Sequence, residues 1–84
     1  MSVAPTMTYN ITGRFNSSVI LKFIELDKTS FDRYNPGFDN KIAVEAKYEL
    51  RLPTRMMNIF LAKRYEILDE SMQLLLKQTN GGTQ

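Results

Sequence analysis

Residues 54–78 constrain the fold more than any other segment, because their apolar side chains recur at the spacing of a helix with one buried face. At about 100° per residue these side chains fall on one broad arc of about 200°, and most charged side chains fall opposite. The arc contains Met56, Met57, Phe60, Leu61, Tyr65, Ile67, Leu68, Met72, Leu74, Leu75 and Leu76. Pro53 suits the first turn of a helix, and Asn80 or Gly81 suits a left-handed cap after it. We therefore predict one long C-terminal helix.

Three shorter segments have the composition of strands. Residues 41–52 alternate apolar and charged side chains with only Ala43 out of step, and residues 8–15 alternate in a similar way. Residues 19–26 fit either element: their β-branched content favours a strand, and the alternative is a helix with Ser17 as its N-cap. We predict an α+β fold in which a small antiparallel sheet of about three strands packs against the long C-terminal helix.

The remaining segments set the limits of the domain. Residues 1–7 are predicted to be an extended arm, and residues 80–84 a flexible tail. Residues 27–40 are predicted to form a loop, with a Pro-Gly pair at the centre of a type II turn. We therefore expect a single domain over residues 8–79.

The chain has 84 residues without His or Cys, and this removes most enzyme classes. A disulfide, a Cys/His metal site and a catalytic Ser-His-Asp or Cys-His set are impossible within one such chain. Glu45 and Glu49 share a face of the predicted strand, but about 13 Å separates them, which is too far for a glycosidase pair. We expect a protein that is not an enzyme and uses no metal, cofactor or small-molecule substrate.

The charge and the hydropathy pattern bear on localisation and partners. No apolar run approaches the roughly 18 residues of a membrane helix, and the N-terminal residues lack the regions of a secretion signal. We therefore expect a cytoplasmic protein without membrane contact. The formal net charge of +2 is small, so nucleic acid is a less favoured partner than protein.

The predicted loop mixes aromatic side chains with charges, and aromatics and Arg are enriched in binding hot spots. Its partner-binding candidates are Phe31, Arg33, Tyr34 and Phe38. Alternatively, Phe31 and Phe38 fold back to close the core. The same rings also suit stacking on the bases of single-stranded nucleic acid.

The helical arc offers a second candidate. Arg64 lies inside the apolar arc, so its guanidinium must pair, extend to solvent or meet a partner surface. The arc is also wide for a small sheet to cover. Met57, Leu61, Met72 and Leu76 are expected to remain at the surface, and we predict a homo-oligomer or a protein partner there.

One segment carries a family resemblance. Residues 48–53 (Tyr-Glu-Leu-Arg-Leu-Pro), followed by an amphipathic helix, resemble the start of a ribbon-helix-helix DNA-binding repressor. The resemblance covers residues 47–78 and implies that alternate strand residues read bases and that Ser71 caps a second helix. The nucleic-acid candidates are Lys47, Glu49, Arg51 and Arg55. The short segment after Ser71, and the two further strands predicted before the ribbon, depart from the family pattern.

These observations lead to two hypotheses of function. The first is a small non-enzymatic binding protein that acts through protein–protein contacts, as an assembly component or as an inhibitor of a larger complex. Proteins of phages and mobile elements often have this size and lack catalytic residues, so a phage or mobile element is the origin that we associate with this hypothesis. The alternative is a DNA-binding transcriptional regulator of ribbon-helix-helix type.

Overall fold

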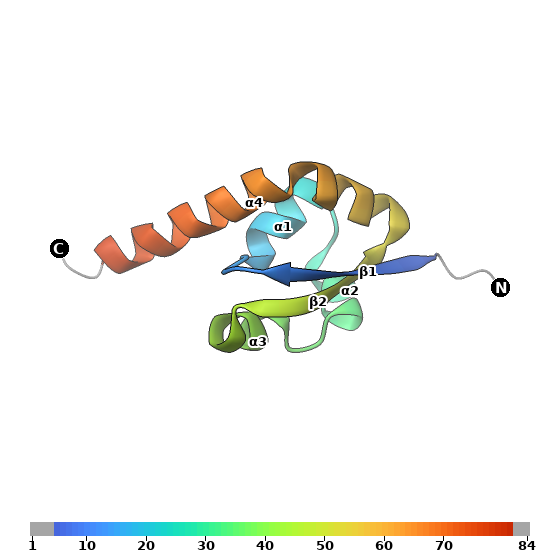
Figure 1. The fold of residues 1–84 in the computed structure, drawn as a ribbon, viewed down its shortest axis with the longest axis horizontal. Coiled ribbons are helices and arrows are strands. Elements are labelled where there is room, and N and C mark those ends of the chain that lie inside the picture. The colour runs from blue at the N-terminus through green and yellow to red at the C-terminus, as the bar shows by residue number, and fades with distance from the viewer. Residues whose placement is uncertain (1–4, 82–84) are drawn as a thin grey trace.

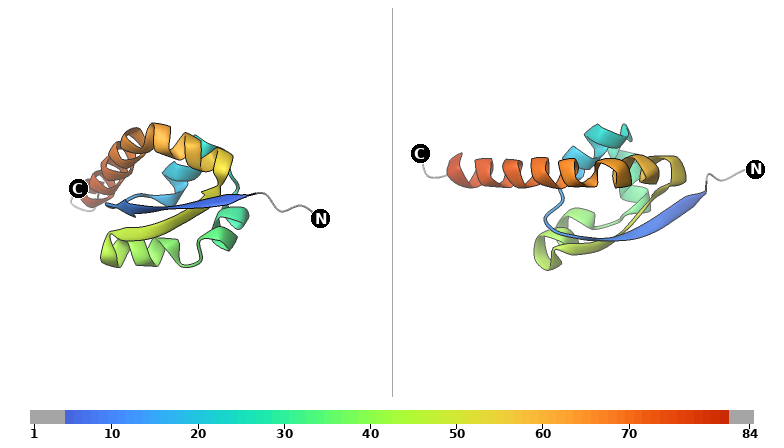
Figure 2. Two further views of the ribbon diagram at one scale, coloured as in Figure 1. Left: turned by 45° about the vertical axis from the view of Figure 1, so that its right-hand side comes forward. Right: turned by 45° about the horizontal axis from the view of Figure 1, so that its top comes forward.

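The computed structural model describes residues 5–81 and has an α+β fold with a long C-terminal helix (Figure 1). In chain order the elements are β1 (Thr6–Thr12), α1 (Ser17–Ile24), α2 (Lys28–Tyr34), α3 (Phe38–Glu45), β2 (Lys47–Pro53) and α4 (Thr54–Gly81). Helix α1 packs on α4, whereas α2 and α3 lie beside β2 (Figures 1 and 2). The predicted fold class is therefore confirmed in its main parts.

The sheet is an antiparallel pair of β1 and β2, in register from Thr6 opposite Pro53 to Thr12 opposite Lys47. Among residues 5–81 these are the only two strands, so the expectation of about three strands is wrong. Leu50 and Leu52 of β2 are buried, while Glu49 and Arg51 are exposed. One face of the ribbon thus meets the core, as the alternating pattern predicts.

The prediction of a strand over residues 19–26 is wrong, because residues 17–24 form α1. Asn16 is the N-cap, and its side-chain oxygen accepts hydrogen bonds from the backbone N–H groups of Ser18 and Val19 at 2.8 and 3.3 Å. Val19, Ile20 and Ile24 are buried on one helical face. The helical alternative is correct, with the cap one residue earlier than expected. A satisfied N-cap and a buried helical stripe here outweigh β-branched propensity.

The predicted loop over residues 27–40 contains α2 and the start of α3, and the strand predicted from residue 41 begins only at Lys47. Ile42 is buried and Val44 is 80% exposed, so the apolar alternation before Lys47 does not mark a sheet face. Phe38 and Ile42, four residues apart, instead form the buried side of α3. Gly37 precedes α3 with a φ of 69°, a left-handed conformation that glycine adopts without strain.

Helix α4 confirms the prediction of one long helix from residue 54, and it continues through Gly81 rather than ending at a cap near residue 80. It crosses the ribbon and α1, and its last turns run past the rest of the described chain (Figures 1 and 2). This accounts for the elongated shape of 54 × 23 × 21 Å. The core consists of Ile11, Phe15, Val19, Ile20, Ile24, Phe31, Phe38, Ile42, Leu50, Leu52, Met57, Phe60 and Ile67.

The two terminal segments were predicted to be an arm over residues 1–7 and a tail over residues 80–84. Thr6 and Met7 belong to β1, and the N–H of Thr54 donates to the carbonyl of Pro5 at 3.0 Å, so this part of the arm is tied to the domain. Residues 1–4 and 82–84 lie outside the described residues.

Candidate interaction surface

The aromatic residues that the sequence placed in a binding loop mostly lie in the core. Phe31 and Phe38 are buried, and their rings meet edge to face with centroids 5.2 Å apart. Phe38 meets Tyr48 in the same way at 4.9 Å. Burial raises the pKa of Tyr48, whose hydroxyl donates to the carbonyl of Pro36 at 3.1 Å. Phe31 and Phe38 therefore close the core, and neither offers a ring for a partner or a base.

The other two candidates from the predicted loop, Arg33 and Tyr34, lie in different environments. Arg33 is exposed on α2, whereas Tyr34 is half-buried in a hollow between α2 and the start of α4. This hollow brings Tyr34 together with Arg55, which the sequence had assigned to a different site. Its remaining lining residues include Pro5, Leu26, Ser30, Pro53, Thr54, Met56 and Asn58.

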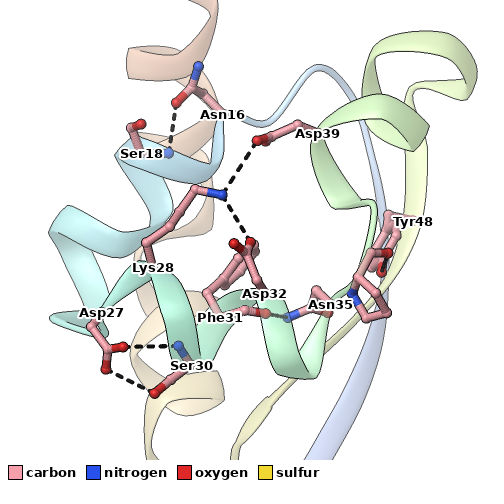
Figure 3. Close-up of polar contacts among 11 residues, drawn as sticks. Asn16, Ser18, Asp27, Lys28, Ser30, Phe31, Asp32, Asn35, Asp39 and Tyr48 are labelled. Carbon is pink, nitrogen blue, oxygen red and sulfur yellow. Dashed lines mark hydrogen bonds and ion pairs between the residues drawn. The ribbon is translucent and has the colours of Figure 1, made fainter.

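The charged residues of the same segment cap α2 and pair with one another (Figure 3). The Asp27 carboxylate accepts hydrogen bonds from the backbone N–H and the hydroxyl of Ser30, each at 2.9 Å, and these bonds lower the pKa of Asp27. The Lys28 ammonium lies 2.9 Å from Asp32 and 3.8 Å from Asp39, so it connects α2 to α3. The hydrogen bond to Asp32 raises the pKa of Lys28.

Asn35 is a structural residue that the sequence did not single out. Its side chain is buried and pairs with the backbone of Arg51 in both directions, donating to the carbonyl and accepting from the N–H at 2.8 Å each. Asn35 thus satisfies backbone groups at the outer edge of β2, where another strand would otherwise pair. An Asn immediately before a Pro-Gly pair predicts a turn, but nothing in the sequence shows which backbone its amide meets.

The nucleic-acid candidates of the strand lie where alternation placed them. Lys47, Glu49 and Arg51 are exposed, and across the ribbon they oppose Thr12, Asn10 and Thr8. Glu49 lies between the two cations, so this polar face carries mixed charge.

The helices do not follow the ribbon-helix-helix pattern, because α4 is unbroken at Ser71. The Ser71 hydroxyl is buried, donates to the carbonyl of Ile67 at 2.7 Å, and accepts from the N–H of Asn16 at 3.0 Å. Ser71 therefore attaches α4 to the start of α1 and caps no second helix.

Arg64, which the sequence placed inside the apolar arc, reaches the surface along the helix. One guanidinium N–H donates to the carbonyl of Leu61 at 2.6 Å, and the guanidinium carbon lies 4.7 Å from the ring centroid of Tyr65. Tyr65 as a residue is 74% exposed. Arg64 and Tyr65 thus form a stacked, half-exposed pair beside the end of β1, with Tyr9 and Leu68 nearby.

The wide apolar arc of α4 divides into two stripes. The first faces the core and contains Met57, Phe60 and Ile67. The second stripe lies beside it and consists of Leu61, Tyr65, Leu68, Met72 and Leu76. Leu61 and Leu68 are half-buried against the core, whereas Tyr65, Met72 and Leu76 are 74%, 38% and 55% exposed.

The sequence predicted a surface remainder of the arc, and part of it is correct. Met72 and Leu76 are exposed as expected, but Met57 is fully buried, so its assignment to the surface is wrong. Tyr65 and Leu75, which are 74% and 38% exposed, are arc residues that the prediction missed, and Leu61 is half-buried. Periodicity alone shows that the arc is wide, but not which of its edges meets the core.

Comparisons with known proteins add no identification: no family model, curated protein or solved structure matches this chain. None of the described helices is long and apolar enough to cross a membrane. No group of acidic side chains within residues 5–81 gathers in a way that would hold a metal ion.

Proposed function

We propose that this chain is a small non-enzymatic binding protein that acts through protein–protein contacts, and that the second stripe of α4 is its contact surface. The observation that carries the proposal is the second stripe itself, in which Tyr65, Met72 and Leu76 are exposed and Leu61 and Leu68 are only half-buried. A single exposed apolar residue is ordinary, but a contiguous row along one helix is typical of an interaction site.

The composition of the stripe supports this proposal. Tyr65 and Arg64 are residue types enriched at binding hot spots, and their stacking holds both side chains in place before a partner arrives. An arranged aromatic side chain loses little conformational entropy on binding. The exposed turns of α4 also gain packing that the 84-residue domain cannot supply alone.

The proposal is tested by replacing exposed stripe residues and measuring what is lost. We expect Tyr65→Glu with Met72→Glu to keep the fold, because both side chains are exposed, and to abolish binding of the partners that the tagged wild-type chain captures from its source cells. The matched control is Lys63→Glu with Gln73→Glu, two exposed positions on other faces of α4. Equal capture by wild type and both variants would contradict the proposal.

A second candidate function, DNA binding through the ribbon, rests on the exposed polar face that carries Lys47, Glu49 and Arg51. A two-stranded ribbon fits the major groove, and cations beside it would neutralise phosphates. This reading predicts a mobility shift of duplex DNA at low salt that Lys47→Ala and Arg51→Ala weaken. The absence of any shift at low salt would exclude it.

A further inference from the structure

We infer that the partner of the second stripe is a second copy of this chain, and that the two α4 helices pair side by side, parallel and in register. This inference rests on the proposed function, because it uses the same surface and names what covers it. Its argument uses the spacing of the stripe, the charges beside it and the shape of the molecule.

The spacing of the stripe matches the repeat of a two-helix coiled coil. Leu61, Tyr65, Leu68 and Met72 are separated by four, three and four residues, and Leu75 continues the same spacing. These are alternating d and a positions of a heptad. The a and d positions from Leu61 to Leu75 extend over about 21 Å of helix at about 1.5 Å per residue. This length is therefore enough for two heptads to meet.

The charges beside the stripe complement a second copy in one orientation. Arg64 directly precedes an a position and Asp69 directly follows a d position, so they flank the stripe on opposite sides. Arg64 is therefore a g position of the heptad and Asp69 is an e position. In a parallel pair, a g residue faces the e residue five positions later in the partner, and Arg64 and Asp69 are five positions apart. Each dimer would contain two such pairs.

Asp69 has the properties that this pairing needs. It is exposed, and it has no ion pair with another residue of the described chain, unlike the neighbouring Glu70, which pairs with Lys22 of α1. An antiparallel pair would place e beside e and g beside g, and so would leave Arg64 and Asp69 on separate sides. The charges thus favour the parallel arrangement.

The shape of the molecule agrees with this arrangement. The last turns of α4 extend beyond the strands and beyond α1 (Figures 1 and 2). Met72 and Leu76, in the C-terminal half of α4, are 38% and 55% exposed. A helix end that stands alone in water is marginally stable. A parallel partner would cover both projecting ends at the same place, and the two domains would lie on opposite sides of the helix pair.

Single cysteines test the register directly, because the chain contains no Cys of its own. In a parallel, in-register pair each a position faces its own copy, so Met72→Cys should oxidise to a covalent dimer under mild oxidant. Gln73→Cys, one residue further along and exposed on another face, is the matched control and should stay monomeric on a non-reducing gel. Sedimentation equilibrium of the wild type should show a monomer–dimer exchange with concentration.

The charge pairs give an independent measurement. Arg64→Glu or Asp69→Arg alone should raise the dimer dissociation constant about fivefold, and the double exchange should restore it. Restoration is diagnostic, because a purely structural role of Arg64 in contacting Leu61 would not be rescued by a change at Asp69.

The remaining outcomes separate this inference from the proposed function. A dimer in which both cysteines cross-link equally, or neither does, would overturn the parallel register and leave the stripe as a contact surface. A strict monomer at every concentration would overturn the second copy as partner. Loss of captured partners in the stripe variant, against the matched control, would then still support the proposed function.

Discussion

At the scale of single residues, three polar side chains hold the chain together in place of a larger core, and two of them, Asn35 and Ser71, are buried. Asn16 caps α1, Ser71 binds the backbone of Asn16, and Asn35 binds the backbone of Arg51. Ser71 and Asn35 connect elements that are distant in sequence, whereas Asn16 caps its own helix. All three satisfy backbone groups that would otherwise be unpaired. Such residues are easily taken for turn formers, because their partners lie elsewhere in the chain.

Asn35→Ala should lower the free energy of unfolding by about 2–3 kcal/mol, since it leaves the N–H and the carbonyl of Arg51 without partners at a part-buried edge. Chemical denaturation measures the change. Asn40→Ala, at an exposed position of α3, is the control and should have little effect. Equal stability of the two variants would show that the Asn35 side chain does not hold β2.

The Asp27 cap of α2 predicts that the stability of the protein depends on pH in the acidic range. Hydrogen bonds from Ser30 lower the pKa of Asp27 below its ordinary value of 3.8, so folding favours the ionised carboxyl. That contribution is fully present above the pKa of the unfolded chain and is lost as the pH falls through the lower pKa of the folded state. The melting temperature of wild type should therefore fall relative to that of Asp27→Asn below about pH 4. Parallel melting curves of the two proteins from pH 6 to about pH 2.5 would contradict this assignment.

At the scale of elements, the sequence predicts the helices and strands that have a long regular pattern or a clear terminating residue such as Pro53. The alternation before Pro53 predicts β2 in part, and the helical period after Pro53 predicts α4 almost completely. The alternation near the N-terminus predicts β1. The three short helices were missed or left ambiguous, because each has only 7 or 8 residues, too few for a helical period to stand out. In residues 41–46 the alternation arose by chance, since only Ile42 of that stretch is buried.

The ends of these short helices also contain local strain that can be removed. Ala46 terminates α3 with a φ of 57°, a left-handed conformation that disfavours residues with a Cβ. Ala46→Gly should therefore raise the free energy of unfolding by about 1 kcal/mol, and thermal melting would show it. Ala62→Gly, in the middle of α4, should lower it by about the same amount. If both substitutions changed the free energy of unfolding in the same direction, the backbone conformation at Ala46 would not be the cause.

At the scale of the whole molecule, the candidate surface follows from a mismatch between one long helix and a small body. A two-stranded ribbon and α1 cover only one side of α4, so its broad apolar arc cannot be fully buried within one chain. The sequence showed the width of the arc but not its division. The division depends on how α4 packs on Phe15, on α1 and on the ribbon, which are contacts between distant segments.

This division predicts opposite behaviour for two apolar residues of α4. Phe60 is fully buried and packs on Phe15 with ring centroids 5.6 Å apart, so Phe60→Ala should cost about 3–5 kcal/mol at any protein concentration. Met72→Ala removes a side chain that is 38% exposed, so it should change the stability of the dilute chain little. Its effect should grow with protein concentration, because the stripe contributes to stability only when a second molecule covers it.

Denaturation of both variants and of wild type at a low and a high protein concentration measures this difference. The wild-type midpoint should rise with concentration, the midpoint of Phe60→Ala should be low at both concentrations, and that of Met72→Ala should rise less than wild type. A large loss of stability for Met72→Ala in dilute solution would place Met72 in the core and remove the distinction between the stripes. A wild-type midpoint that does not change with concentration would contradict self-association through α4 and leave the stripe to a partner of another kind.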